Sequence, residues 1–175
     1  MATYRSVDEL QHLGDFHDVY VRRAAWQGNN LVCSIYSWIV PSENSQNSHS
    51  TAMFVNEAEV VFAHCRIVHI KHLGMQEFCD NIVTTVQPHI LKLNEYARFA
   101  AEDMSDCPIE HVANYTQMLD GNYTATVHFC FHEVELIFSK VTVSWDTYAG
   151  KYINGCIIRD IPYSEEDTTW LSEKS

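Results

Sequence analysis

One pattern constrains this chain more than any other: an apolar alternation of period two that changes phase in mid-strand and occurs twice. The two copies are Glu59–Ile70, EVVFAHCRIVHI, and Glu133–Asp146, EVELIFSKVTVSWD. In both, alternating apolar residues lead to a Phe, a small residue and a basic residue follow, and the alternation then resumes in the other phase. Because the side chains of a strand point alternately to its two faces, such a change of phase predicts a β-bulge. Two long bulged strands predict an antiparallel sheet built from an internal repeat.

Each bulged strand is preceded by two shorter strands around a turn. The turns are Gln27–Asn30 and Asp120–Asn122, and both contain the Gly and Asn residues that tolerate a positive φ. We therefore predict a three-stranded antiparallel meander made twice, over residues 17–70 and 109–146, that forms a curved sheet or a partial barrel. Residues 1–175 are expected to form a single domain, since a chain of this length can bury a real core.

Helices are expected beside the sheet, so the predicted fold class is α+β. Ser6 to Glu9 has the S-x-x-E pattern of a capping box, and Gly14 is placed to end a short N-terminal helix. Between the repeats, residues 74–106 change to a helical period, which predicts a helical insert. The polar stretch Pro41–Thr51 predicts a long mobile loop in which nothing favours burial.

Charge and cysteine usage limit the classes of partner. The net charge is −12, from 11 basic and 23 acidic residues, which argues against nucleic acid because phosphates are bound by Lys and Arg. An acidic surface favours a basic protein partner, although the same charge also serves solubility. No stretch has the length of a transmembrane helix, and the start of the chain lacks the pattern of a secretory leader. Six scattered cysteines are then expected to be reduced and mostly buried, which predicts a cytoplasmic protein without a membrane partner.

The polar residues do not form a recognisable catalytic or metal pattern. His128 and His132 are expected on one face of one strand, where they would lie about 13 Å apart, too far for a shared zinc ion. The sequence also has no nucleophile elbow, phosphate loop or Gly-rich dinucleotide turn. We therefore predict no catalytic residue, no cofactor and no metal, and we favour a binding protein over an enzyme.

Candidate contact residues follow from two alternatives. Tyr36 and Trp38 lie on the second face of the apolar segment Leu31–Val40, where they predict an exposed patch for a partner or for a homodimer. The alternative is a sheet-based pocket that binds or turns over a small apolar ligand. Its mouth would carry four polar side chains: His17, Asp18, His128 and His132.

The opening segment Leu13–Asp18, LGDFHD, resembles the start of several small bacterial protein families, some of which are immunity proteins that neutralise toxins. The Phe-small-basic triplets at 62–64 and 138–140 belong to the same resemblance. It implies an acidic, single-domain, intracellular protein without catalytic activity, and it carries over no binding residue. The expected function is therefore a non-catalytic protein–protein binding module, in the form of an immunity-type inhibitor of a basic toxin.

Overall fold

The computed structural model describes residues 3–9, 19–79, 82–96, 107–129 and 131–159. Apart from one 3-10 turn, η2 (Leu93–Glu95), every element in these ranges is a strand. The strands are β1 (Tyr4–Val7), β2 (Val19–Gln27), β3 (Asn30–Val40), β4 (Ala52–Ala63), β5 (Arg66–His72), β6 (Met75–Cys79), β7 (Ile82–Val86), β8 (His89–Ile90), β9 (Cys107–Gln117), β10 (Tyr123–Phe129), β11 (His132–Phe138), β12 (Lys140–Trp145), β13 (Gly150–Ile153) and β14 (Cys156–Arg159).

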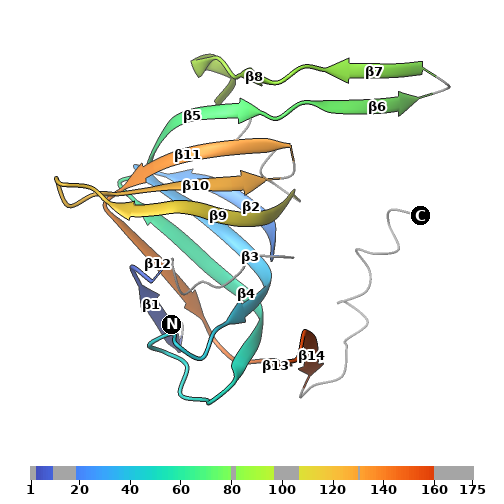
Figure 1. The fold of residues 1–175 in the computed structure, drawn as a ribbon. Helices are drawn as coiled ribbons and strands as arrows, with labels where there is room; N and C mark the ends of the chain where they lie inside the picture. Colours follow the sequence, from blue (N-terminus) through green and yellow to red (C-terminus); the bar gives the residue numbers. More distant parts are fainter. Residues whose placement is uncertain (1–2, 10–18, 80–81, 97–106, 130, 160–175) are drawn as a thin grey trace.

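The main sheet closes on itself through two bent strands, each made of two consecutive strands of the chain (Figure 1). Its order is β1-β12-β4-β3-β2-β9-β10-β11-β5-β8, and every pairing is antiparallel. β5 continues β4 after a bend at His64, and β12 continues β11 after a bend at Ser139. Because β4 pairs with β12 while β5 pairs with β11, the bent strand β4–β5 lies beside the bent strand β11–β12. The sheet from β4 through β3, β2, β9 and β10 to β11 is thereby closed into a ring, with β1 and β8 added at its ends. The antiparallel sheet predicted from the alternation is confirmed.

The two bends that form the ring are in contact with each other. His64 has a φ of 48°, and its Nδ1 lies 3.0 Å from the hydroxyl of Ser139 in a hydrogen bond. The backbone N–H of Ser139 donates to the carbonyl of Ala63 at 2.9 Å. Both bends lie at the phase changes seen in the sequence, so the long strands turn together at one place.

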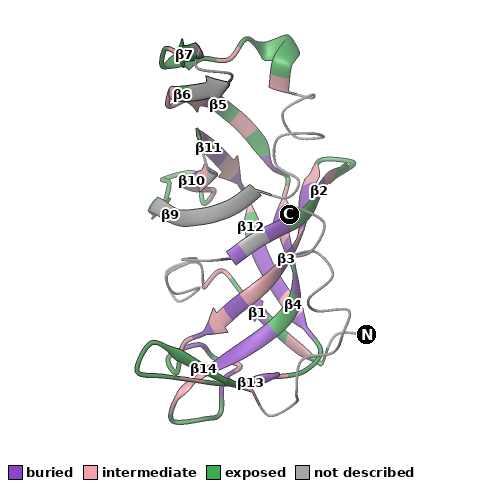
Figure 2. Ribbon diagram, turned by 90° about the vertical axis from the view of Figure 1, so that its right-hand side faces the viewer, coloured by how far each residue is buried: buried purple, intermediate pink, exposed green. Residues whose placement is uncertain are grey.

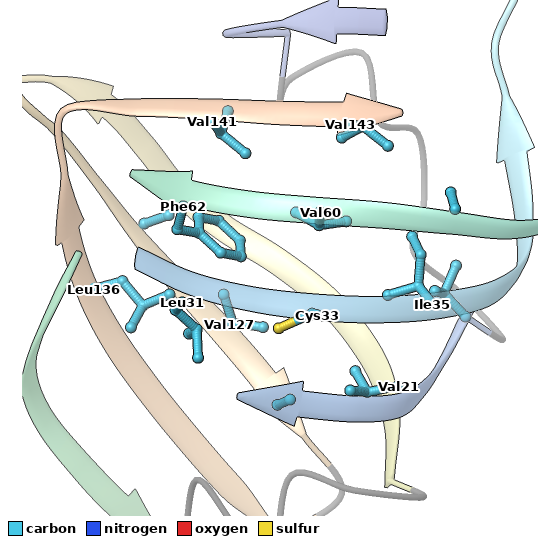
Figure 3. Close-up of a cluster of buried hydrophobic side chains, with 14 of the residues drawn as sticks. Val21, Leu31, Cys33, Ile35, Val60, Phe62, Val127, Leu136, Val141 and Val143 are labelled. Carbon is cyan, nitrogen blue, oxygen red and sulfur yellow. The ribbon is translucent and has the colours of Figure 1, made fainter. Parts of the chain in front are cut away.

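The phase change keeps apolar side chains inside the ring on both sides of each bend. On the second long strand, the buried residues before the bend are Val134, Leu136 and Phe138, and those after it are Val141, Val143 and Trp145. Side chains from β2, β3, β4, β10, β11 and β12 meet in the same core (Figure 3). Burial is concentrated on β3, β4 and β12, whereas β7 and β14, at opposite ends of the molecule, are exposed (Figure 2).

Among the described residues, one junction of the ring has fewer residue pairs than the others. β2 and β9 are joined by three residue pairs, Val19 with Ile109, Tyr20 with Pro108 and Val21 with Cys107. By contrast, β3 and β4 are joined by nine pairs. We call the β2–β9 junction the seam.

The α+β class predicted from the sequence is wrong: strands account for 66% of the structure and helical residues for 3%. In place of a helical insert over 74–106, Met75–Cys79 and Ile82–Val86 form an antiparallel hairpin. The run Ile82-Val83-Thr84-Thr85-Val86 is β-branched throughout, and such side chains favour strands because they are restricted at χ1 in a helix. Residues 97–106 lie outside the described residues.

The N-terminal helix is also replaced by a strand, β1, which pairs with β12. The pattern that predicted a capping box does bring its side chains together, since the Ser6 hydroxyl donates to Glu9 Oε2 at 2.6 Å. They meet after a strand, however, because Asp8 continues the pairing: its N–H donates to the Val141 carbonyl at 2.9 Å, and its Oδ1 accepts the Val141 N–H at 2.8 Å. The rest of the predicted helix, including Gly14, lies outside the described residues.

The loop over Pro41–Thr51 contains buried polar residues, so the expectation that nothing in it favours burial is wrong. Asn47 is only 8% exposed, and its amide Nδ2 donates to three backbone carbonyls, those of Val40, Pro41 and Thr51, at 3.0 to 3.2 Å. Asn44 is buried as well and donates to the Ser6 hydroxyl at 3.1 Å. One asparagine side chain therefore satisfies the carbonyls at both ends of the loop.

Candidate functional site

The structure does not place Trp38 on an exposed patch. Its side chain is 0% exposed and meets Trp145 edge to face, with ring centroids 5.0 Å apart. Ser37, immediately before it, has a φ of 62°, which changes the phase of β3 so that Ile35 and Trp38 are both buried. Tyr36 is half-buried. The prediction of an exposed patch at Trp38 is therefore wrong.

His128 and His132 lie on neighbouring strands rather than on one continuous strand. The chain reverses between β10 and β11, so that Phe129 pairs with His132 and His128 pairs with Glu133. The expectation that they share a strand face about 13 Å apart is wrong because the turn falls between them. His17 and Asp18 lie outside the described residues.

His132 belongs to a group of three imidazoles at one end of the ring. It pairs with His72 across β11 and β5, and His72 pairs with His89 across β5 and β8. The ring centroids of His72 and His132 are 4.8 Å apart and nearly perpendicular, whereas those of His72 and His89 are 5.2 Å apart and stacked. We call His72, His89 and His132 the histidine cluster.

The cluster lies where the apolar interior of the ring ends. Ile70 of β5 and Val134 of β11 are paired and fully buried. Two residues further along, on the same strand faces, are His72 and His132. Since alternate residues of a strand share a face, the inward rows continue from aliphatic side chains into half-buried imidazoles.

Two of the three imidazoles have defined hydrogen-bonding roles. The Nδ1 of His72 accepts the backbone N–H of Gly74 at 2.9 Å. The Nδ1 of His89 lies 2.9 Å from the carbonyl of Gln87, which can only accept, so this nitrogen carries the proton. The tautomers of His72 and His89 are therefore opposite.

Carboxylates accompany the outward-facing histidines nearby. His69 Nδ1 lies 3.1 Å from Glu135 Oε2, and His128 Nε2 lies 4.0 Å from Glu133 Oε2. Glu133 is also the register partner of Lys71 on β5. The carboxylates of Glu133 and Glu135 therefore lie on the outward face next to the cluster, and each already contacts another histidine.

The described residues contain no group of three or more His, Cys, Asp or Glu side chains that could hold a metal ion. Two buried thiols are also unsuited to nucleophilic chemistry. Burial raises the pKa of Cys33 and of Cys65 to about 12, so both stay protonated at neutral pH, and the thiolate is the reactive form.

Beyond the cluster, β6 and β7 extend away from the ring as a two-stranded hairpin (Figure 1). Among the described strands they pair only with each other, and we call this hairpin the arm. Val83 on β7 is 53% exposed. At the base of the arm, the N–H of Leu73 donates to the Phe131 carbonyl at 2.7 Å, and the next N–H, of Gly74, is the one bound by His72.

Comparison with models of known protein families, with curated proteins and with solved structures found no match in any of the three. The resemblance of the opening segment to immunity-type families therefore stays a prediction. In the part of the chain that the structure describes, no helix has the length and apolar character needed to cross a membrane.

Sequence reasoning missed both the arm and the cluster. The β-branched run Ile82–Val86 was the available signal for the arm. No spacing connects His72, His89 and His132, because strand pairing alone brings them together.

Proposed function

We propose that this chain is a non-catalytic protein-binding module that binds an extended segment of a basic protein along the arm. The observation that carries the proposal is that the arm stands apart from the ring and pairs only with itself within the described chain. An isolated two-stranded hairpin is only marginally stable in water, and its outer edges present backbone N–H and C=O groups that accept a further strand.

The charge of the arm supports a basic partner. Between residues 73 and 91 the sequence contains Glu77 and Asp80 and no Lys or Arg. The whole chain, with a net charge of −12, adds a long-range attraction for cationic proteins.

Apolar side chains near the arm support protein as the partner class. Large hydrophobic residues are exposed on the arm and on the segments next to it, namely Val83, Ile90, Leu93 and Phe131. Apolar side chains beside open strand edges supply the contacts that backbone pairing alone lacks.

The specific form of the proposal is an immunity-type inhibitor of a basic toxin in the cytoplasm. The resemblance of Leu13–Asp18 supports the inhibitor role, and the free thiols of Cys33 and Cys65 agree with a reducing compartment.

The test identifies a partner by cross-linking in cells that produce the chain, and then measures its affinity for purified variants. Val83→Lys places a charge on the arm that opposes strand addition and repels a basic segment. Ile158→Lys is the matched control, since Ile158 is 51% exposed on β14 at the other end of the molecule. We expect Val83→Lys to raise the dissociation constant of the complex at least tenfold and Ile158→Lys to change it less than twofold. Equal effects of the two substitutions, or a partner that is not basic, would refute the proposal.

A further inference from the structure

We propose that the histidine cluster is a pH-sensitive anchor that holds the arm in place when its imidazoles are neutral and loosens it when they are protonated. The loosening of the arm is a property of the chain alone. Its consequence, release of the bound partner in mildly acidic solution, rests on the proposed function.

The hydrogen bond at the base of the arm requires neutral His72. The Gly74 N–H donates to His72 Nδ1, so this nitrogen has to carry a lone pair. An imidazolium has a proton on both nitrogens and accepts no hydrogen bond. Protonation of His72 therefore breaks this contact, and histidine is the side chain that ordinarily changes charge between about pH 5 and 8.

Two further imidazoles lie against His72. His89 of β8 stacks on His72, and His132 of β11 meets it edge to face. The Nδ1 of His89 donates to the Gln87 carbonyl. Positive charges on adjacent imidazoles repel one another. This repulsion further weakens the contacts that attach the arm to the ring.

Within the part of the chain that the structure describes, further charged groups near the cluster lie on β5, β10 and β11. They are His69 with Glu135, His128 with Glu133, and Lys71, which pairs in register with Glu133. Both carboxylates are on the outward face and contact other histidines, whereas His72 and His132 are on the inward face. Lys71 adds a further positive charge next to His72 in the chain.

Gly74 makes the anchor effective because the chain is tightly packed there. Its φ is +90°, and a Cβ atom at this position would lie 3.0 Å from both the Pro88 Cδ and the carbonyl oxygen of Val86. Gly74 directly precedes the first strand of the arm, and Val86 is the last residue of its second strand. The two ends of the arm are therefore close together where His72 binds Gly74. Loss of the His72 contact therefore acts on both strands of the arm.

The test is hydrogen exchange of the full chain without a partner, between pH 5 and 8, corrected for the intrinsic pH dependence of exchange. We expect the protection of the arm amides to fall about tenfold, or more, from pH 7 to pH 5. His72→Asn places a carbonyl oxygen near the position of Nδ1 and does not titrate in this range, so its arm should keep the same protection at both pH values. His49→Asn, in the loop between β3 and β4, is the control and should behave as the native chain does.

Equal protection of the native arm at pH 5 and pH 7, or the same loss in His72→Asn, would overturn the anchor. Because no partner is present in this experiment, the result is independent of the proposed function. An arm that loosens at pH 5 while Val83→Lys leaves partner affinity unchanged would refute the proposed function and retain the anchor.

Discussion

Replacement of Gly74 by Ala introduces two energetic costs at the base of the arm, one from the backbone conformation and one from steric overlap. The φ of +90° is unfavourable for any residue with a Cβ, which costs about 1–2 kcal/mol. The added methyl would also lie 3.0 Å from the Val86 carbonyl oxygen and the Pro88 ring, neither of which is the end of a flexible side chain. Overpacking of this kind costs typically about 1–3 kcal/mol. We therefore expect the free energy of unfolding to fall by about 2–5 kcal/mol in total. The steric part of this loss arises only at the base of the arm.

Gly121 provides the matched control for this prediction. Its φ is +84°, close to that of Gly74, but a Cβ there would have nothing within 4 Å. Gly121→Ala should therefore show the backbone penalty alone, at the turn between β9 and β10. Its effect on the free energy of unfolding should be about 1–2 kcal/mol, measured by urea denaturation followed through tryptophan fluorescence.

The arm supplies the second readout. If the Gly74 penalty is relieved by local opening, the arm amides of Gly74→Ala lose protection in hydrogen exchange even where global unfolding changes little. The arm of Gly121→Ala should exchange as in the native chain. The reasoning is refuted if the arm of Gly74→Ala keeps native protection and its urea midpoint is no lower than that of Gly121→Ala.

Two further substitutions test the packing of the ring and its longest loop. Phe138→Ala removes a fully buried ring that lies 5.1 Å from the ring of Phe62, and it should lower the free energy of unfolding by about 3–5 kcal/mol in urea denaturation; a loss below about 1 kcal/mol would contradict a packed ring interior. Asn47→Ala leaves the carbonyls of Val40, Pro41 and Thr51 without their shared donor and should lower stability by about 1–3 kcal/mol. The exposed neighbour Ser48, replaced by Ala, should change stability by less than about 0.5 kcal/mol, and a comparable loss at both positions would show that Asn47 does not organise the loop.

The strands were the predictable part of this fold because their signals are local. Alternation around the turns Gln27–Asn30 and Asp120–Asn122 located two hairpins, and the phase changes near His64 and Ser139 located both bends. These signals depend on residues within a few positions of one another.

The errors arose where a local pattern fits two structures. At a helix start, Ser6 and Glu9 would each bind a backbone N–H, whereas at the end of β1 the Ser6 hydroxyl donates directly to the Glu9 carboxylate, so the same residue pattern fits both structures. Burial of Trp38 depends on the positive φ of Ser37, which is not a residue that marks this conformation in sequence.

The candidate site could not be predicted because it depends on pairing between distant strands. His72 meets His132 only because β5 lies beside β11 in one register, and a shift of one residue would turn one of the two imidazoles to the other face. A bulge between Glu135 and Leu136 is part of that register. Sequence spacing contains no measure of either feature.

The seam between β2 and β9 also bears on the order in which the strand pairs of the ring form. Three residue pairs of the described chain form it, and Pro108, in the middle pair, lacks an N–H to donate. The pairs that form the seam are also distant in sequence, since they join residues 19–21 to residues 107–109. In kinetic terms, this long separation in sequence predicts that the ring closes last at the seam, after the hairpins on either side have formed.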